Sequence, residues 1–177
     1  AVQRSNPEMQ KRVENVIRSL AEAEDNPIIS IHDHGAGGHL NCLSELVETT
    51  GGHFDLSKFP IGDETLSSRE IIGNESQERM GLLVKEDALE RIARIAERER
   101  APMYVVGETT SDMHLTFEEK GGGKPIDLAL SDMFGSAPKT YMYDKTVERQ
   151  YAPLVNEPAK LEEYLDLVLQ QEGVGCK

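Results

Sequence analysis

The stretch from residue 32 to residue 39 gathers the side chains with the most evident chemistry in this chain. It holds His32, Asp33, His34 and His39 around a run of small residues, Gly35, Ala36, Gly37 and Gly38. Imidazole and carboxylate groups at such spacing can ligate zinc or a pair of metal ions, as dense His/Asp loops do in metal-dependent hydrolases. A glycine run can instead bring backbone N–H groups up to a phosphate. The stretch therefore predicts a site for a metal ion, an anion, or both.

Each of these interpretations has a plainer structural alternative. The three histidines of the stretch can be partly exposed loop residues, because no cysteine or second histidine cluster completes a tetrahedral set, and His53 and His114 are remote in the sequence. The glycines can form a tight turn that needs positive φ and binds nothing. We keep a small metal-dependent hydrolase, built on these histidines and Asp33, as the alternative function.

A second polar segment, Asn74-Glu75-Ser76-Gln77-Glu78-Arg79, contains no apolar residue and comes directly before an apolar run at 80–84. Side chains on a loop that ends at a strand can converge on a polar substrate. Glu75 and Gln77 offer a carboxylate and an amide, which suit an amide-bearing ligand. A solvated loop is the plain alternative for this segment.

The sequence around the glycine run predicts the elements that position it. The apolar run 27–31 predicts a short buried strand, and the spacing of Leu40, Leu43, Leu46 and Val47 predicts a helix after the glycines. Backbone N–H groups at such a turn point outward, and the dipole of the following helix favours negative charge. Asp33, at the end of the strand, adds a carboxylate that can ligate a hard cation such as Mg²⁺.

The rest of the chain alternates helices and strands first and continues with hairpins, a pattern that predicts an α/β fold layered on a mixed sheet. Asn6-Pro7 reads as a helix start. The patterns further predict an edge strand at 53–56, a helical turn at 69–73, a strand at 80–84, a helix at 87–100, a strand at 103–106, a hairpin of 114–117 with 126–128, an extended stretch at 140–147 and a helix at 158–171.

Size and composition exclude several classes of protein. The 177 residues suggest one domain with an appended tail, and the formal net charge of −13 argues against non-specific binding of nucleic acid. No apolar run is long enough to span a bilayer. Cys42 and Cys176 are far apart, which favours a reducing cytoplasm over a disulfide framework. The ends of the sequence suggest a processed protein or a fragment of a longer one.

Taken together, the two polar segments resemble a known family. Ser30-Ile31-His32-Asp33-x-Gly35-Ala36-Gly37-Gly38, then Ser44-Glu45-Leu46-Val47, then 74–79, closely resemble phosphoribosylformylglycinamidine synthase in its large, single-chain form. The opening residues 2–9, the run Arg98-Glu99-Arg100-Ala101-Pro102 and Val106-Gly107-Glu108 fit the same family. The resemblance covers residues 1–145. Residues 146–177 match no motif and are expected to form a linker and a helix toward a next domain.

The resemblance implies a fold and a set of partners. This region is similar to the first of two C-terminal-type domains of the aminoimidazole ribonucleotide (AIR) synthetase superfamily, which have a layered α/β/α fold with a mixed sheet, partly like a ferredoxin fold. Such a domain packs against a preceding ATP-binding domain, and a glutaminase domain supplies ammonia. The family reaction is an ATP-dependent amidation that converts formylglycinamide ribonucleotide to the amidine. The isolated chain is therefore expected to be inactive.

The resemblance also implies roles for individual residues. Asp33 would ligate Mg²⁺ or orient the phosphates of ATP, and Gly35, Ala36, Gly37 and Gly38 would let the backbone approach the ligand. Gln3, Glu75, Ser76 and Gln77 would contact formylglycinamide ribonucleotide. The catalytic histidine of the family belongs to the preceding domain, so no catalytic residue is expected in this chain.

Other residues of the two segments depart from the family pattern or stay open. His34 and His39 stand where the pattern has aliphatic residues, which argues against a family-wide metal role and leaves His32 to line the cleft. Arg79 can reach a phosphate or brace its loop by pairing with Glu75 or Glu78, and bracing is the favoured interpretation. A third function, an interaction module whose acidic surface docks a basic partner, also remains open.

Overall fold

The structure is a computed structural model that describes residues 6–75, 78–155 and 157–175. Two compact units, residues 1–137 and 138–177, are treated separately below. The predicted boundary at residue 145 stays a prediction. Within the described residues, no helix combines the length and the apolarity that crossing a bilayer requires.

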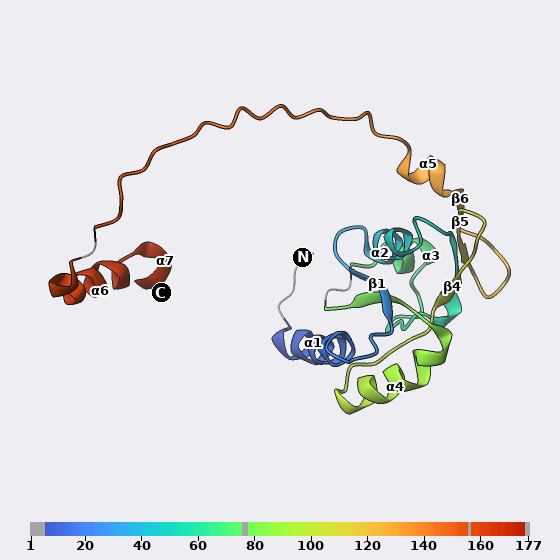
Figure 1. Ribbon diagram of the computed structural model, residues 1–177. Helices are drawn as coiled ribbons and strands as arrows, with labels where there is room; N and C mark the ends of the chain where they lie inside the picture. The colour runs from blue at the N-terminus through green and yellow to red at the C-terminus, as the bar shows by residue number, and fades with distance from the viewer. Residues whose placement is uncertain (1–5, 76–77, 156, 176–177) are drawn as a thin grey trace. The chain divides into compact units, whose positions relative to one another are not determined.

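The first unit begins with a layer of two helices on a two-stranded sheet (Figure 1). Helix α1 (Pro7–Ala21) starts as predicted, because the Asn6 side chain accepts a hydrogen bond from the Met9 N–H. Strand β1 (Ile28–Asp33) pairs antiparallel with β3 (Met80–Val84). Helix α4 (Leu89–Arg98) follows the short 3₁₀ turn η2 (Glu86–Ala88) and packs beside α1. A buried apolar cluster joins these helices to the strands and contains Val16, Leu20, Ile92, Ala96 and Ala101.

A second layer of helices covers the other face of β1 and β3. Helix α2 (Gly38–Leu46) lies so close to β3 that a side chain at Gly81 would meet the sulfur of Cys42. Helix α3 (Ser68–Ile72) packs against α2 and begins with a capping box of Ser67 and Glu70. The larger apolar core lies between these helices and the second sheet.

The second sheet has four strands in the order β4-β2-β5-β6. Strand β2 (Gly52–Asp55) pairs parallel with β5 (His114–Glu118) and antiparallel with β4 (Gly107–Thr109), and β6 (Ile126–Ala129) completes the predicted hairpin with β5. The short elements η1 (Leu56–Lys58) and α5 (Leu130–Phe134) follow β2 and β6.

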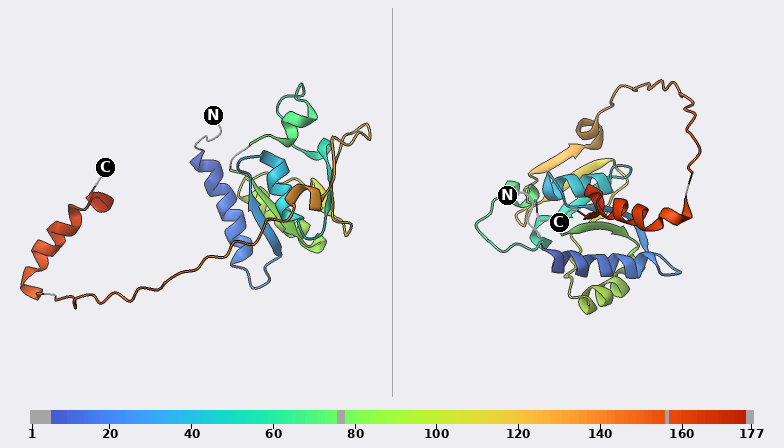
Figure 2. Two further views of the ribbon diagram at one scale, coloured as in Figure 1. Left: turned by 90° about the horizontal axis from the view of Figure 1, so that it is seen from above. Right: turned by 90° about the vertical axis from the view of Figure 1, so that its left-hand side faces the viewer.

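The layers therefore run from α1 and α4, through β1 and β3, through α2 and α3, to the four-stranded sheet (Figure 2). The predicted class, a layered α/β fold with a mixed sheet, is confirmed. The division of the six strands between two sheets was not predicted.

Two strand predictions are wrong in detail. The segment 53–56 was predicted as an edge strand, whereas β2 lies between β4 and β5. Its polar residues His53 and Asp55 alternate with the buried Phe54 because one face of the sheet is open, not because the strand is at an edge. The segment 103–106 is not a strand, although the Val106 carbonyl accepts a hydrogen bond from the Asp55 N–H, and the pairing starts at Gly107.

The second unit contains the predicted C-terminal helix. The turn η3 (Pro158–Lys160) leads into α6 (Leu161–Leu169), and α7 (Glu172–Gly175) follows. Residues 140–147 form neither a helix nor a paired strand.

The backbone conformation just past the end of α4 leads to a first prediction about stability. Arg100 has a φ of 56° just past the helix, and the Ala101 N–H donates to the Ala96 carbonyl, which is the hydrogen bond of a Schellman motif. Because glycine adopts this conformation without strain, we expect Arg100→Gly to raise the free energy of unfolding by about 1 kcal/mol in urea titrations.

The matched control for this change is Arg94→Gly, at an exposed position inside the same helix. There the glycine should lower the free energy of unfolding by about 1 kcal/mol. An equal loss of unfolding free energy in Arg100→Gly and Arg94→Gly would show that the backbone at Arg100 is not strained.

Candidate functional site

The structure brings the glycine run and the second polar segment together. Strand pairing places Asp33 opposite Met80, so the loop after β1 and the segment before β3 leave the sheet side by side. The His34 N–H donates to the Arg79 carbonyl at 3.2 Å, and the Gly37 N–H donates to the Glu75 carboxylate at 3.3 Å. The two segments therefore form one continuous surface patch.

Close packing of the chain explains two of the glycines. Gly37 and Gly38 have φ values of 83° and 61°. A Cβ atom on Gly38 would lie 2.6 Å from the Asn74 carbonyl oxygen, so only glycine lets the start of α2 approach this backbone. The glycines thus form the tight turn with positive φ that the sequence allowed, and this turn lets α2 pack against the 74–79 segment.

The predicted ligand-contacting residues are placed as follows. Asp33, Ala36 and Gly37 are exposed, Gly35 and Glu75 are partly buried, and Gly38 is buried. Gln3, Ser76 and Gln77 lie outside the described residues. The roles of all these residues in binding stay predictions.

Asp33 fits a magnesium ion only as part of a larger ligand set. Its carboxylate is exposed beside the loop, and a Cβ atom at position 35 would lie 3.2 Å from its Oδ2 atom. Within the described ranges, His, Cys, Asp and Glu side chains form no group of three or more that could hold a metal ion. Mg²⁺ commonly keeps several waters and uses one or two carboxylates together with substrate phosphates. Asp33 meets that requirement for one carboxylate.

The expectation that all three histidines are partly exposed is wrong for two of them. Only 8% of the surface of His34 and 5% of that of His39 is exposed to solvent. His34 Nε2 lies 2.9 Å from His39 Nδ1, and Arg79 Nη1 lies 3.3 Å from His39 Nε2. Burial, with a smaller contribution from the nearby Arg79 charge, lowers the pKa of His34 to about 4 and that of His39 to about 3. Both imidazoles are therefore neutral at pH 7.

This geometry does not support a histidine metal centre. The facing nitrogens of His34 and His39 bond to each other, and His32 turns its Nδ1 atom to the Glu45 carboxylate on α2 at 3.0 Å. The predicted pairing of Arg79 with Glu75 or Glu78 is also wrong, because no carboxylate of the described residues lies within ion-pair distance of its guanidinium. Arg79 braces the loop through His39 and through its own carbonyl.

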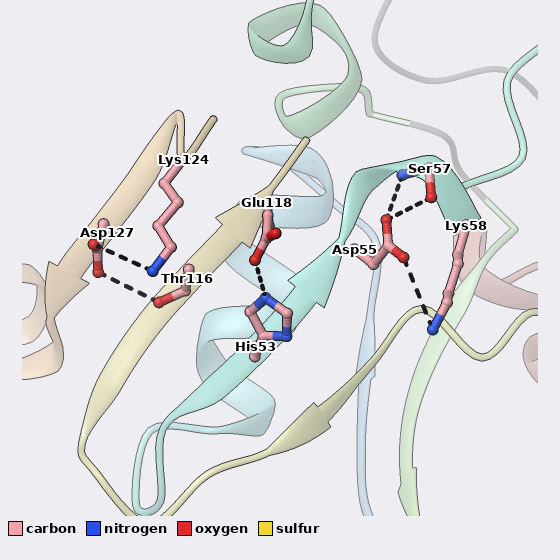
Figure 3. Close-up of polar contacts among 8 residues, drawn as sticks. All are labelled: His53, Asp55, Ser57, Lys58, Thr116, Glu118, Lys124 and Asp127. Carbon is pink, nitrogen blue, oxygen red and sulfur yellow. Dashed lines mark hydrogen bonds and ion pairs between the residues drawn. The ribbon is translucent and has the colours of Figure 1, made fainter. Parts of the chain in front are cut away.

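The remaining histidines belong to the open face of the four-stranded sheet. His53 of β2 and Glu118 of β5 point toward each other across the two strands, with His53 Nε2 at 2.9 Å from Glu118 Oε2 (Figure 3). His114 pairs with Asp127 at 2.9 Å. Both histidines thus contact carboxylates on neighbouring strands, apart from the glycine loop.

Sequence reasoning missed the buried His34–His39–Arg79 cluster. A signal was present, because His39 stands one residue before Leu40 in the predicted helix and one turn before Leu43, on a face that packs inward. The histidines were instead judged by their loop-like, glycine-rich surroundings.

Comparison with solved structures agrees with this fold. Phosphoribosylformylglycinamidine synthase II from Thermotoga maritima superposes with a TM-score of 0.66 at 22% identity, covering 84% of this chain and 25% of that one. T. maritima PurL complexed with ADP gives a TM-score of 0.68 at 22% identity, over 95% of this chain and 30% of that one. The same PurL has been solved with FGAR and with ATP. A chain of the HypE–HypF complex is more distant, with a TM-score of 0.53 and 17% identity.

The chain thus spans between a quarter and a third of the length of the PurL chains that it resembles. At this level of identity the likeness establishes the fold. The family itself comes from the sequence, because residues 1–120 match the model of the AIR synthase related protein, C-terminal domain. That match covers most of the first unit, including both segments of the candidate site, and the chain therefore belongs to the family of AIR synthase related proteins as a C-terminal-type domain.

Proposed function

We propose that this chain is the substrate-side domain of a phosphoribosylformylglycinamidine synthase, the ATP- and glutamine-dependent ligase of purine biosynthesis. The observation that carries the proposal is the contact between the glycine loop and the 74–79 segment, made by the Gly37–Glu75 and His34–Arg79 hydrogen bonds. Two segments that resemble the same enzyme, distant in sequence, form one patch. The fold of T. maritima PurL, solved as a complex with FGAR, supports the same assignment.

The patch would act by binding and orientation. Phosphoryl transfer to an amide oxygen depends on positioned charges and donors more than on a covalent catalyst. Asp33 would hold Mg²⁺, which neutralises charge on the phosphates when bound. The exposed Ala36 and Gly37 would let the ligand come close to the backbone, and Glu75 would accept hydrogen bonds from formylglycinamide ribonucleotide together with Gln3, Ser76 and Gln77.

The proposal includes further domains. An ATP-binding domain would form the opposite wall of the cleft, and a glutaminase domain would supply ammonia, in the cytoplasm. On this basis the 177-residue chain alone should show no ATP- and glutamine-dependent turnover. Turnover by the chain alone would remove this part of the proposal.

The test uses the full-length enzyme that carries this domain. Glu75→Gln keeps an acceptor for the Gly37 N–H and removes the charge, so we expect the KM for formylglycinamide ribonucleotide to rise about tenfold or more, because hydrogen bonds to a charged group contribute about 1.5–3 kcal/mol. Asp33→Asn should lower kcat and raise the Mg²⁺ concentration needed for half-maximal rate. Steady-state measurement of ADP release checks both.

The matched control is Glu48→Gln, an exposed carboxylate just after α2. Its kinetics should equal those of the unchanged enzyme. A wild-type KM in Glu75→Gln, together with a wild-type kcat and Mg²⁺ dependence in Asp33→Asn, would overturn the assignment of the patch as the substrate site.

A further inference from the structure

A cavity of about 230 Å³ lies on the other side of the glycine loop, between α1, β3, α4 and the segment 101–106. In Figure 1, α1 and α4 lie together on one side of β1 and β3. Most of the lining is apolar, and it includes Val13, Ile17, Leu82, Ile92 and Met103. His34, His39 and Arg79 line the same cavity and supply its polar groups. None of the described residues with a proposed role toward the substrate or Mg²⁺ lines this cavity, namely Asp33, Gly35, Ala36, Gly37, Gly38 and Glu75.

Arg79 brings a positive charge to the cavity, and no carboxylate in the described part of the chain pairs with it. Burial lowers the pKa of its guanidinium, but the group stays charged at pH 7. Glu78 also lines the cavity, and its carboxylate accepts a hydrogen bond from the Asn6 N–H at 3.2 Å rather than pairing with Arg79. A partly buried guanidinium without a carboxylate is costly, so the site favours an anion.

The hydrogen bonds of the cluster leave a buried donor unused. Arg79 can only donate, so His39 Nε2 accepts and His39 Nδ1 carries the proton. His39 Nδ1 then donates to His34 Nε2, which puts the proton of the neutral His34 on Nδ1. Among the described residues, this Nδ1 atom is buried and has no hydrogen-bond partner. Because solvent cannot reach this atom, a ligand in the cavity cannot reach it either, and Arg79 is the group of the cluster that can bind an anion.

We propose that this cavity is a second binding site, which takes a small carboxylate with an apolar body. The carboxylate would pair with the Arg79 guanidinium, and the body would contact the apolar walls from α1 and α4. A cavity of about 150 Å³ is known to hold benzene, so this larger one has room for a six-carbon ring or chain together with a carboxylate. This inference does not depend on the proposed synthase function.

The test uses the 177-residue chain and benzoate as the probe. Isothermal titration calorimetry should show saturable binding of one benzoate, and the Tm should rise with benzoate concentration. Benzamide, which keeps the ring and an oxygen acceptor but lacks the charge, should bind about tenfold more weakly or worse, and acetate, which lacks the apolar body, should not raise the Tm at equal ionic strength.

A matched pair of variants tests whether Arg79 binds the carboxylate. Arg79→Gln should weaken benzoate binding about tenfold or more, whereas Arg69→Gln, on exposed α3, should not change it. Should Arg79→Gln fail to fold, Val13→Phe fills the cavity from α1 and should abolish binding. Three results would each overturn the proposal: equal affinities for benzoate and benzamide, unchanged binding in Arg79→Gln, or no binding of benzoate.

Discussion

Gly38→Ala should lower the free energy of unfolding of this chain by about 2–5 kcal/mol in urea titrations. A non-glycine residue at the φ of 61° costs about 1–2 kcal/mol, and its Cβ atom would lie 2.7 Å from the Gly73 and Asn74 carbonyl carbons. Both neighbours are backbone atoms, so relief requires the glycine loop and the 74–79 segment to move apart, at a further cost of about 1–3 kcal/mol.

The same displacement should affect function. If the glycine loop and the 74–79 segment together form the substrate patch, Gly38→Ala in the full-length enzyme should raise the KM for formylglycinamide ribonucleotide, even under conditions where the protein stays folded. Because the Gly37–Glu75 hydrogen bond spans the displaced boundary, the effect should be at least as large as that of Glu75→Gln.

Two other glycines serve as controls for Gly38→Ala. A Cβ atom on Gly62 would have no neighbour within 4 Å, so Gly62→Ala should leave stability unchanged or raise it by about 0.4–1 kcal/mol. Gly35→Ala meets only the Asp33 side chain, at 3.2 Å, and should cost less than Gly38→Ala. Indistinguishable urea midpoints for Gly38→Ala and Gly62→Ala would contradict the close approach on which the patch depends.

The local elements of this fold were predictable because each follows a local rule. Asn6-Pro7 caps α1, apolar runs mark β1 and β3, and the spacing of Leu40, Leu43 and Leu46 marks α2. The resemblance of the two polar segments to one family predicted that they act together, and the Gly37–Glu75 hydrogen bond joins them. Each of these signals is carried by residues within one segment, although the two polar segments are distant from each other in the sequence.

What the sequence could not predict depends on pairing between distant segments. The alternation of His53, Phe54 and Asp55 shows which side of β2 faces the core, but it contains no information about whether β4 lies beside it. His39 looked like a loop residue beside glycines, and its burial results from the packing of Phe59 at 4.7 Å and of Arg79, 40 positions later. Such contacts appear only once the chain has folded.

The buried His39 should make the stability of the chain fall steeply in mild acid. Its pKa is about 3 in the folded protein, because burial and the neighbouring His34 and Arg79 disfavour protonation, and about 6.5 in the unfolded chain. The unfolded state therefore takes up a proton below pH 6.5 that the folded state does not, so stability is lost as the pH falls. For this one histidine we expect a loss of about 2 kcal/mol between pH 7 and pH 5.

His39→Gln isolates this contribution, because the neutral amide can still accept from Arg79 and donate to His34. Urea titrations at several pH values should show a shallower loss between pH 7 and pH 5 in the variant, by about 2 kcal/mol, and parallel curves above pH 7.5. Carboxylates with a lowered pKa, such as Asp63 and Glu70, lose their contribution to stability at lower pH. The change in stability between pH 7 and pH 5 therefore comes from the histidines. If His39→Gln lost stability as steeply as the unchanged chain, His39 would have to bind its proton in the folded state, and the neutral hydrogen-bond chain from Arg79 to His34 could not exist.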